Sequence, residues 1–509
     1  MIPLRFFYGA MKMNKYLTTP IYYASGTPHL GHAYTTLVAD CYRRYYRLTD
    51  HDVKLISGTD EHGQKIERAA LAEGTDTTEF IEARSDEFQA LWRTLGIDLD
   101  AFVRTTDSRH VARVLPFWQN IADKGDIYLG QYEGLYCVEC EQYFTTGEEC
   151  PVHRRPLETF SEESYFFRLS RYQSRLIEHI ESHDDFILPR ERRNEVLSLL
   201  KNSELRDLSI SRTSTRWGIP VPRDNRHVMY VWIDALVSYL SALATEDFNA
   251  FWPSATHFIG KDILIFHAVY WPALLLSAEI PLPLSLKVNG WLTIEGKKIA
   301  KSDPDTIVDP VALIEEIGTD GLTYFFLKGV PFGGDVNFVR QQVYQLLNAD
   351  LANNVGNLIS RFVTLVQRDF SGAIDITSPV LEECDHELLA VLKDGAQEWQ
   401  DAFERAEPHV AARIFAASAA SINRYLQHEE PWNLIKNEEN RGRVAVILLV
   451  VHSALSSLCV LGSPFVPDII EKVRTSLCLQ GDLCWSSVGA FGSQIRTRKT
   501  QSVYPRLSS

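Results

Sequence analysis

The segment Pro28–His32 combines residue types that suit the binding of a phosphate chain. It places His29 and His32 three residues apart around Gly31, between an apolar extended run and a helical pattern. A turn that opens a helix offers unpaired main-chain N–H groups and the positive end of the helix dipole to an anion. The spacing also puts both imidazoles on one face of the first turn. We therefore expect a phosphate-binding site at the start of this helix.

A second segment with phosphate-binding character, Lys298–Ser302, lies about 270 residues downstream. It has the composition of a loop and supplies the cations of Lys298 and Lys301 and the hydroxyl of Ser302. Such a set suits a triphosphate from which pyrophosphate is released. Either segment alone is a weak signal.

Four potential metal ligands cluster within 17 positions. Two residues separate Cys137 from Cys140, and two residues separate Cys150 from His153. These spacings match a closed tetrahedral zinc site with no open position for a substrate. The alternative is three buried cysteines beside an incidental histidine, which the two short spacings disfavour. We predict one structural zinc ion.

The surrounding pattern is that of an α/β protein. Between residues 15 and 118, short apolar strands such as Lys54–Gly58 alternate with helical patterns such as Asp86–Leu95, which is typical of a parallel sheet. From 119 to 220 the pattern breaks into turns and short strands, and at Met229–Trp232 the alternation resumes. The break and resumption indicate a domain inserted into a nucleotide-binding fold.

The C-terminal third is predicted to be a helical bundle. Long helical patterns cover Gln341–Arg368, Glu382–Ala406, His409–His428 and Val444–Leu461, with almost no strand signals. The predicted parts of the chain are an N-terminal extension (1–14), the two halves of a Rossmann-like catalytic domain (15–118 and 221–305), an inserted connective domain with the zinc knuckle (119–220), a connecting segment (306–340), the helical domain (341–480) and a tail (481–509).

Length and composition exclude several classes of protein. A chain of 509 residues needs roughly two to four domains, and a net charge of −15 argues against a protein that binds any nucleic acid through a basic coat. The chain has eight cysteines, and those outside the metal cluster are scattered. They do not form a disulfide framework, so we expect a reducing, cytoplasmic compartment. The most apolar run, Val444–Leu461, is interrupted by His452 and three serines and is predicted to be a buried helix, not a membrane span.

Nine blocks in a fixed order resemble the methionyl-tRNA synthetases, a family of class I aminoacyl-tRNA synthetases, over nearly all of the chain. The blocks are Thr19–Tyr23 before Pro28–His32, Gly58–Gly63, the zinc knuckle, Asp207–Arg212, Tyr230–Ala235, Gly260–Ile263 with His267, Lys298–Ser302, Asn353–Arg361 and Pro431–Trp432. Pro28–His32 and Lys298–Ser302 resemble the HIGH and KMSKS signatures of the class. The resemblance implies ATP-dependent ligation of L-methionine to methionine tRNA through a methionyl-adenylate, with release of AMP and pyrophosphate. It also implies that the bundle binds the anticodon.

The resemblance further implies roles for individual residues. The implied ATP-binding residues are His29, Gly31, His32, Lys298, Lys301 and Ser302, and the implied catalytic residues are His29, His32, Lys298, Lys301 and Arg212. The implied methionine pocket consists of Ile21, Tyr23, Asp60, Trp232, Ala235, Leu236, Tyr239, Ile263 and His267. The residues implied to read the CAU anticodon are Asn353, Asn357, Arg361 and Trp432. The implied ligands are L-methionine, ATP with Mg²⁺, one structural Zn²⁺, and initiator and elongator methionine tRNA.

Physical chemistry supports the implied methionine pocket. A thioether is apolar and polarisable, so aromatic and aliphatic side chains suit it, and its ammonium group in a dry site needs a carboxylate, which Asp60 supplies. We expect Tyr23, Asp60 and Trp232 to follow strands of one sheet, and His267 to lie on a helix after another strand. Strand carboxyl ends in such a sheet converge on one crevice. Taken singly, Trp232 or Tyr239 would be an ordinary core residue.

The implied anticodon residues also have a physical reason. Unstacked bases stack on an indole, and amide side chains read their edges. Taken singly, Asn353 and Asn357 would be solvated or capping residues. One departure from the family lies elsewhere: Ile299 and Ala300 replace the central Met and Ser of KMSKS. Ala300 lacks a hydroxyl that could hydrogen-bond within the loop, so loop closure is expected to differ.

Two other functions are considered. A class I synthetase for isoleucine, valine or leucine would carry a far larger inserted editing domain than this insert of about 100 residues, and the cysteine enzyme would hold its metal in the active site. A catalytically silent tRNA-binding paralogue is disfavoured because His29, His32, Lys298, Lys301 and Asp60 are all retained. Since no further domain pattern follows the bundle, we expect a monomer without membrane contact.

Overall fold

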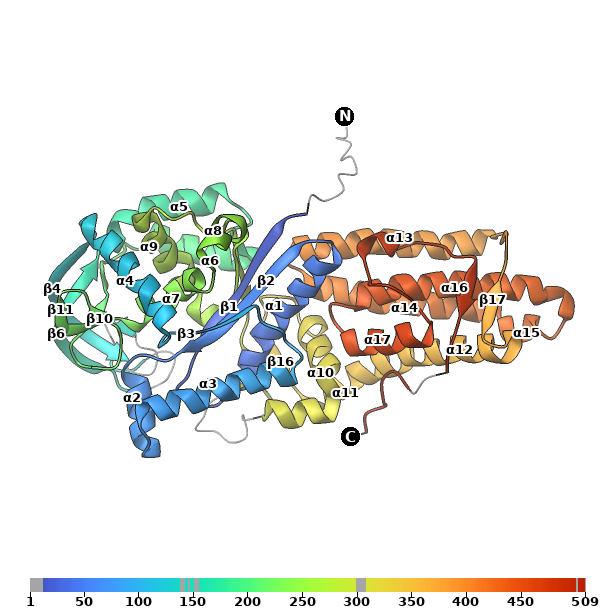
Figure 1. Cartoon of the computed structure of the whole chain (residues 1–509), viewed down its shortest axis with the longest axis horizontal. Helices are drawn as coiled ribbons and strands as arrows, with labels where there is room; N and C mark the ends of the chain where they lie inside the picture. The colour runs from blue at the N-terminus through green and yellow to red at the C-terminus, as the bar shows by residue number, and fades with distance from the viewer. Residues whose placement is uncertain are drawn as a thin grey trace. The chain divides into compact units, whose positions relative to one another are not determined.

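The computed structural model describes residues 12–137, 142–144, 147–150, 155–298, 308–499 and 502–508 (Figure 1). These residues divide into two compact units. The sheet unit comprises the described residues of Asn14–Thr36 and Lys54–Asn289, and the helical unit comprises the described residues of Met1–Met13, Leu37–Val53 and Gly290–Ser509. The predicted combination of a parallel α/β fold and a C-terminal helical bundle is confirmed.

The sheet unit is built on a six-stranded sheet with the order β3-β2-β1-β12-β13-β7. The strands are β1 (Asn14–Tyr23), β2 (Asp52–Asp60), β3 (Ala101–Arg104), β7 (Ile187–Leu188), β12 (Thr256–Gly260) and β13 (Ser285–Asn289). Strand β1 pairs with β12, β12 with β13, β13 with β7, and β2 with β3, all in parallel. Most residues of β1, β12 and β13 are buried, as expected of central strands covered on both faces.

Helices and aromatic side chains form the core around this sheet. The helices are α1 (Leu30–Leu48, which continues into the helical unit), α2 (Gln64–Glu73), α3 (Thr77–Thr94), α4 (Ser108–Asp123), α5 (Gln173–Ser182), α6 (Arg190–Asn202), α7 (Val231–Ser241), α8 (Thr245–Phe251) and α9 (Trp271–Ala278). Helix α4 packs against α7 and α9, and α7 packs against β1 and β3. The fully buried Trp252 and Trp271 lie in this core.

Two smaller sheets complete the sheet unit, and they correct one expectation. One sheet has the order β5-β4-β6-β8, with β4 (Ile127–Cys137), β5 (Gln142–Phe144), β6 (Glu158–Phe167) and β8 (Leu208–Ser209). The other has the order β10-β11-β9, with β9 (Ser211–Arg212), β10 (Pro220–Val221) and β11 (Asp224–Met229). Trp232 follows β11, so the expectation that it follows a strand of the main sheet is wrong: β11 pairs antiparallel with β9 and β10 instead.

Part of the segment predicted as an insertion, 119–220, contributes to the main sheet. Strand β7 lies within this segment and pairs with Leu286 and Lys287 of β13. The helices α5 and α6 flank β7 in the sequence, and both pack nearby, α6 directly against β7 and α5 against α6.

The helical unit contains a bundle, in which α13, α14 and α16 lie side by side (Figure 1). Its helices are α10 (Pro310–Lys328), α11 (Arg340–Leu347), the π-helix η6 (Asn348–Gly356), α12 (Asn357–Phe370), α13 (Glu383–Glu404), α14 (Pro408–Glu429), α15 (Pro431–Leu434), α16 (Arg441–Gly462) and α17 (Pro467–Ser476). The short strands are β14 (Leu292–Ile294), β15 (Lys297–Lys298), β16 (Val336–Phe338), β17 (Ala373–Asp375) and β18 (Gln494–Arg496). The continuous helix predicted over Gln341–Arg368 is therefore interrupted by a π-helix.

Helix α16 is the apolar segment that the sequence predicts to be buried. The stretch Glu438–Gly462 is long and apolar enough to cross a membrane, but 89% of its most apolar window is buried inside the structure. The apolar residues on all sides of the helix contact neighbouring helices such as α13 and α14. The prediction of a buried bundle helix is confirmed.

Candidate functional site

The two histidines predicted to bind phosphate lie where β1 leads into α1. Their rings stack with centroids 3.6 Å apart. The His29 main-chain N–H donates to His32 Nδ1 (3.1 Å), and the Gly31 N–H donates to His29 Nδ1 (3.1 Å). Since both Nδ1 atoms accept, a neutral ring carries its proton on Nε2. A Cβ at Gly31 would lie 3.0 Å from His29 Cε1, so a larger residue there would push against the His29 ring. The pair can therefore present two Nε2–H donors to an anion.

The residues predicted to bind methionine come together in the sheet unit. Trp232 lies beside His267 with ring centroids 6.4 Å apart. Ile21 packs with Ala235 in one apolar cluster, and Tyr23, Trp232, Leu236, Tyr239 and Ile263 belong to or pack on the main core. Asp60, at the end of β2, is 4% exposed. The predicted methionine-binding residues are therefore mostly apolar side chains of the core, with one buried carboxylate in the same unit.

Hydrogen bonds fix the tautomer of His267, and burial keeps its ring neutral. Its Nδ1 lies 2.9 Å from the main-chain oxygen of Ile263, which can only accept, so Nδ1 carries the proton. The hydroxyl of Tyr239 then donates to Nε2 at 2.7 Å. Burial lowers the pKa of His267 to about 4, although the Ile263 hydrogen bond opposes the shift. His267 is therefore neutral at physiological pH.

Sequence reasoning missed the aromatic partner of Trp232. The ring of Phe266 stacks on Trp232 with centroids 3.7 Å apart and an interplanar angle of 16°. Phe266 precedes His267 in a short π-helix, η4 (Phe266–Tyr270). Its position next to a candidate pocket residue was the available signal, but a residue's stacking partner depends on the tertiary fold.

A buried carboxylate between two histidines was also missed. Asp234 of α7 contacts His62 Nδ1 at 2.5 Å and His110 Nε2 at 2.6 Å. The other ring nitrogen of His110 lies 2.8 Å from Ser241 Oγ. Burial alone would raise the pKa of Asp234, but the two histidines lower it to about 2. The network joins His62, which follows the β2 residue Asp60, to α7 and α4.

His62 also reaches the pocket through its main chain, since its carbonyl oxygen accepts a hydrogen bond from the Tyr23 hydroxyl at 2.9 Å. His62 and Asp234 both lie inside blocks that carry the family resemblance. His110 lies outside these blocks, and the sequence offered no signal for it.

Arg212 is held in a buried position on β9. Its guanidinium lies 4.2 Å from the centroid of the Tyr230 ring, which gives a cation–π contact. It donates to Ser209 Oγ (3.1 Å) and to the Ser211 main-chain oxygen (2.7 Å). Glu162 lies 4.0 Å from it. A cation in this setting is firmly positioned.

The second phosphate-binding segment is described only at its beginning. The main chain of Lys298 lies in β15, where it pairs with Thr293 of β14. Lys301 and Ser302 lie outside the described residues.

The predicted zinc ligands are also described only in part. Cys137 ends β4 and is 2% exposed, and Cys150 is fully buried. Cys140 and His153 lie outside the described residues. The burial of both thiols fits a structural metal site.

Three of the four residues predicted to read the anticodon line one groove in the helical unit. Ala349, Asn353, Asn354, Asn357, Ser360, Arg361 and Asn423 line it. The guanidinium of Arg361 lies 4.8 Å from the Trp432 ring centroid. Asn353 and Asn357 are exposed on the groove. A surface with exposed amides and an arginine next to an indole can bind unstacked bases.

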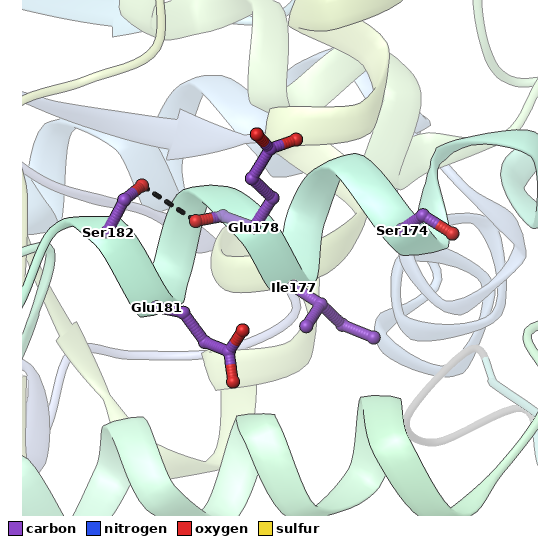
Figure 2. A pocket seen from close by; sticks show the side chains of 5 residues that line it. All are labelled: Ser174, Ile177, Glu178, Glu181 and Ser182. Carbon is purple, nitrogen blue, oxygen red and sulfur yellow. Dashed lines mark hydrogen bonds between the residues drawn. The ribbon is translucent and has the colours of Figure 1, made fainter.

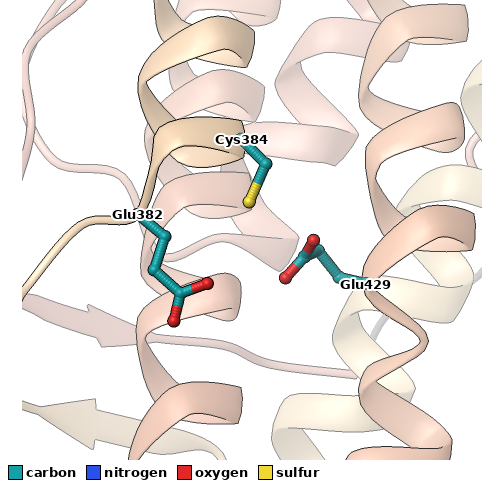
Figure 3. Close-up of side chains that lie close together, drawn as sticks. All are labelled: Glu382, Cys384 and Glu429. Carbon is teal, nitrogen blue, oxygen red and sulfur yellow. The ribbon is translucent and has the colours of Figure 1, made fainter.

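Two other features do not form candidate sites. Figure 3 shows Glu382, Cys384 and Glu429, whose potential ligand atoms lie within 4.8 Å of one another. Arg443 occupies this cluster, because it contacts Glu382 at 3.3 Å, Glu429 at 2.6 Å and Cys384 Sγ at 3.4 Å. A guanidinium there repels a second cation.

The hollow in Figure 2 lies along α5 and is lined by Ser174, Ile177, Glu178, Glu181 and Ser182. Four of these residues are exposed, and Glu181 pairs with Lys201. It contains none of the residues predicted to bind a ligand.

Two family models match the chain. The model described as tRNA synthetases class I (M) matches residues 15–157 and 148–363. The model described as the anticodon binding domain of methionyl tRNA ligase matches residues 378–496.

Individual proteins match over most of their length. The methionine–tRNA ligase of Caldanaerobacter subterraneus is 39% identical over 98% of this chain and 79% of the relative. That of Rickettsia felis is 41% identical over 92% of each chain. The structure resembles a crystal structure of Mycobacterium tuberculosis methionyl-tRNA synthetase bound by methionyl-adenylate, with a TM-score of 0.93, 36% identity, and coverage of 97% of this chain and 100% of that one. The chain belongs to the methionyl-tRNA synthetase family of class I aminoacyl-tRNA synthetases.

Proposed function

We propose that the chain activates L-methionine with ATP and then transfers the methionyl group to methionine tRNA. The observation that carries this proposal is the contact of neutral His267 with Trp232 and Tyr239, with Asp60 as a buried carboxylate in the same unit. Family membership supports it, and the relative of similar structure from Mycobacterium tuberculosis binds methionyl-adenylate.

In the first step, a carboxylate oxygen of methionine attacks the α-phosphorus of ATP. The bond from this phosphorus to the pyrophosphate oxygen breaks, and methionyl-adenylate and pyrophosphate form. The Nε2–H groups of His29 and His32 donate to the phosphates, and Lys298, Lys301 and Ser302 hold the leaving pyrophosphate. Mg²⁺ bound with ATP would share the phosphate charge. Catalysis here is chiefly positioning and charge stabilisation.

Methionine binds with its ammonium on Asp60 and its side chain in the aromatic enclosure. Neutral His267 suits an uncharged thioether, since an imidazolium would have to lose hydration in a buried site. The remaining methionine-binding residues are Ile21, Tyr23, Trp232, Ala235, Leu236, Tyr239 and Ile263. Arg212, fixed on Tyr230, would complete the active site.

In the second step, the terminal adenosine of methionine tRNA takes the methionyl group and AMP leaves. The groove with Asn353, Asn357 and Arg361, together with Trp432, would bind the anticodon bases. Stacking on Trp432 and amide contacts would supply recognition.

We also propose one structural zinc ion held by Cys137, Cys140, Cys150 and His153. The burial of Cys137 and Cys150 supports it, and four such ligands leave no open position. Elemental analysis of the purified protein is expected to give one zinc per chain. Absence of zinc together with freely reactive thiols at all three cysteines would contradict the assignment.

The test of the function is ATP–pyrophosphate exchange that depends on methionine. Exchange with methionine, and much less with isoleucine or cysteine, is the expected result. Exchange with another amino acid in preference to methionine would indicate a different class I synthetase. Absence of any exchange from folded, zinc-loaded protein would indicate a silent tRNA-binding paralogue.

A further inference from the structure

Two asparagines outside the predicted anticodon set are tied together in the lining of the groove. Asn423 of α14 donates through Nδ2 to the main-chain oxygen of Asn354 at 2.9 Å and to its side-chain Oδ1 at 3.0 Å. Asn354 in turn donates through its own Nδ2 to the main-chain oxygen of Ala416 at 2.8 Å. Both ends of the Asn354 amide are therefore bonded to α14.

The two anchor points lie on one face of α14. Ala416 and Asn423 are seven residues apart, which is about two helical turns. Asn354 is thus attached at two levels of a rigid helix, and both its main chain and its side chain are held. We call the contacts among Asn354, Ala416 and Asn423 the asparagine clamp.

The clamp holds the part of the chain with unusual backbone geometry. Asn354 lies in the π-helix Asn348–Gly356. At the end of this segment the Asn357 N–H bonds to the Ala352 oxygen, five residues back, where an α-helix would use the residue four back. A π-helix is rare, and its wider turn needs external support.

The groove residues depend on this geometry. Asn353 lies inside the π-helix, whereas Asn357 and Arg361 lie in α12 beyond it. In a regular α-helix, successive side chains are rotated by about 100° around the helix axis. Returning the π-helix to α geometry would therefore change where Asn353 lies relative to Asn357 and Arg361.

We propose that Asn354 and Asn423 are positioning residues that hold the π-helix and thereby set the spacing of the base-reading side chains. This proposal rests on the proposed anticodon-binding role of the groove. Asn354 lines the groove but does not read a base, because both ends of its amide are engaged inside the protein. The ligand that the clamp serves is a run of unstacked bases.

The test uses Asn354→Ala, Asn423→Ala and the double variant in the full chain. The matched control is Gln427→Ala, which also shortens an amide side chain of α14, at an exposed position one turn from Asn423. For each variant, kcat/KM is measured for charging of a methionine tRNA transcript with the CAU anticodon and of transcripts with one anticodon base changed. Methionine-dependent ATP–pyrophosphate exchange and thermal unfolding are measured in parallel.

Each single variant is expected to lower the preference for CAU by about five- to a hundredfold, the range for one good base contact, with exchange unchanged. The double variant should lose no more preference than the stronger single variant, because both changes remove one clamp. Gln427→Ala should keep the full preference. A clamp that only maintains folding would lower charging of all transcripts equally, and an unchanged preference in Asn354→Ala would overturn the proposal.

Asn357→Ala separates this proposal from the one on which it rests. Loss of CAU preference in Asn357→Ala but not in the clamp variants would overturn the clamp alone. No loss in Asn357→Ala and none in Trp432→Ala would overturn the anticodon assignment of the groove, and the clamp proposal with it.

Discussion

The proposed methionine pocket and the proposed anticodon groove hold their polar side chains in different ways. In the pocket and in the histidine–carboxylate network beside it, Asp60, Asp234 and His267 are each no more than 4% exposed, and the last two are tied by short hydrogen bonds. In the groove, Asn353 and Asn357 face solvent. Asp234 and His267 are hydrogen-bonded inside the protein before a ligand arrives, whereas the groove presents its donors and acceptors outward.

Losing a polar contact should therefore have different consequences in the two regions. A buried polar group that loses its partner costs the free energy of an unpaired group in a dry environment. An exposed amide that loses its ligand regains water. Changes in the pocket network should therefore affect folding and activation together, whereas changes in the groove should affect tRNA charging alone.

The largest effect is expected for Asp234→Ala. It leaves His62 and His110 buried without the carboxylate that both contact, and breaking such a pair costs about 3–5 kcal/mol. The free energy of unfolding, measured with denaturant, should fall by this amount. Asp247→Ala is the control, because it breaks a half-buried pair with Lys54 that is worth about 0–1 kcal/mol. An equal loss of unfolding free energy in both variants would show that the Asp234 carboxylate contributes no more than a half-buried ion pair does.

Asp60→Ala should abolish most methionine-dependent activation. It removes the proposed counter-charge of the ammonium, which in a desolvated site is worth about 2–5 kcal/mol. The kcat/KM for methionine in pyrophosphate exchange should fall at least about thirtyfold, while the KM for ATP changes by less than about threefold. A parallel rise in both KM values would instead indicate a general distortion of the active site.

The two units should also differ in their response to pH. Burial lowers the pKa of His267 to about 4, so the folded chain stays unprotonated there while the unfolded chain takes up a proton near pH 6.5. This contribution to stability is lost as pH falls from 6.5 towards 4. In the helical unit, burial raises the pKa of Asp320 to about 7, despite hydrogen bonds from the N–H groups of Ile469 and Asp468. This contribution is lost as pH rises from 4 to 7.

Each group should change stability by up to about 1.4 kcal/mol per pH unit within its window, or about 3–4 kcal/mol in all. Unfolding free energies of His267→Gln and Asp320→Asn, each compared with the parent chain between pH 4.5 and 7.5, should show slopes of opposite sign. Slopes of the same sign would contradict the difference between the two units.

The local sequence pattern was sufficient to predict the strongly periodic helices and strands, but it was insufficient to predict which strands pair. The strand at Lys54–Gly58 and the buried helix α16 follow directly from runs of apolar residues. The two-residue strand β7 has too little pattern to be seen. The sheet to which β11 belongs is decided by its partners β9 and β10, which no local pattern reveals.

The same limit applies to the sites. The histidines at the start of α1 lie three residues apart, so their spacing alone predicts their contact. Asp234 is 172 residues from His62 and 124 from His110, and only the fold brings them together. The π-helix escaped prediction because the buried Leu351 and Val355 inside it and the buried Leu358 just after it keep the spacing of an ordinary helix.

The smallest effect is expected at the groove. Trp432→Ala removes a stacking surface for one base, which is worth about 1–3 kcal/mol. The kcat/KM for tRNA charging should fall by about five- to a hundredfold, and the change should leave Arg361 without its aromatic partner. Because Trp432 is only partly buried, unfolding free energy and pyrophosphate exchange should stay near those of the parent chain. Equal loss of charging and exchange would show instead that Trp432 is a core residue whose removal disrupts the bundle, and the contrast between an inward-held pocket and an outward-facing groove would not hold.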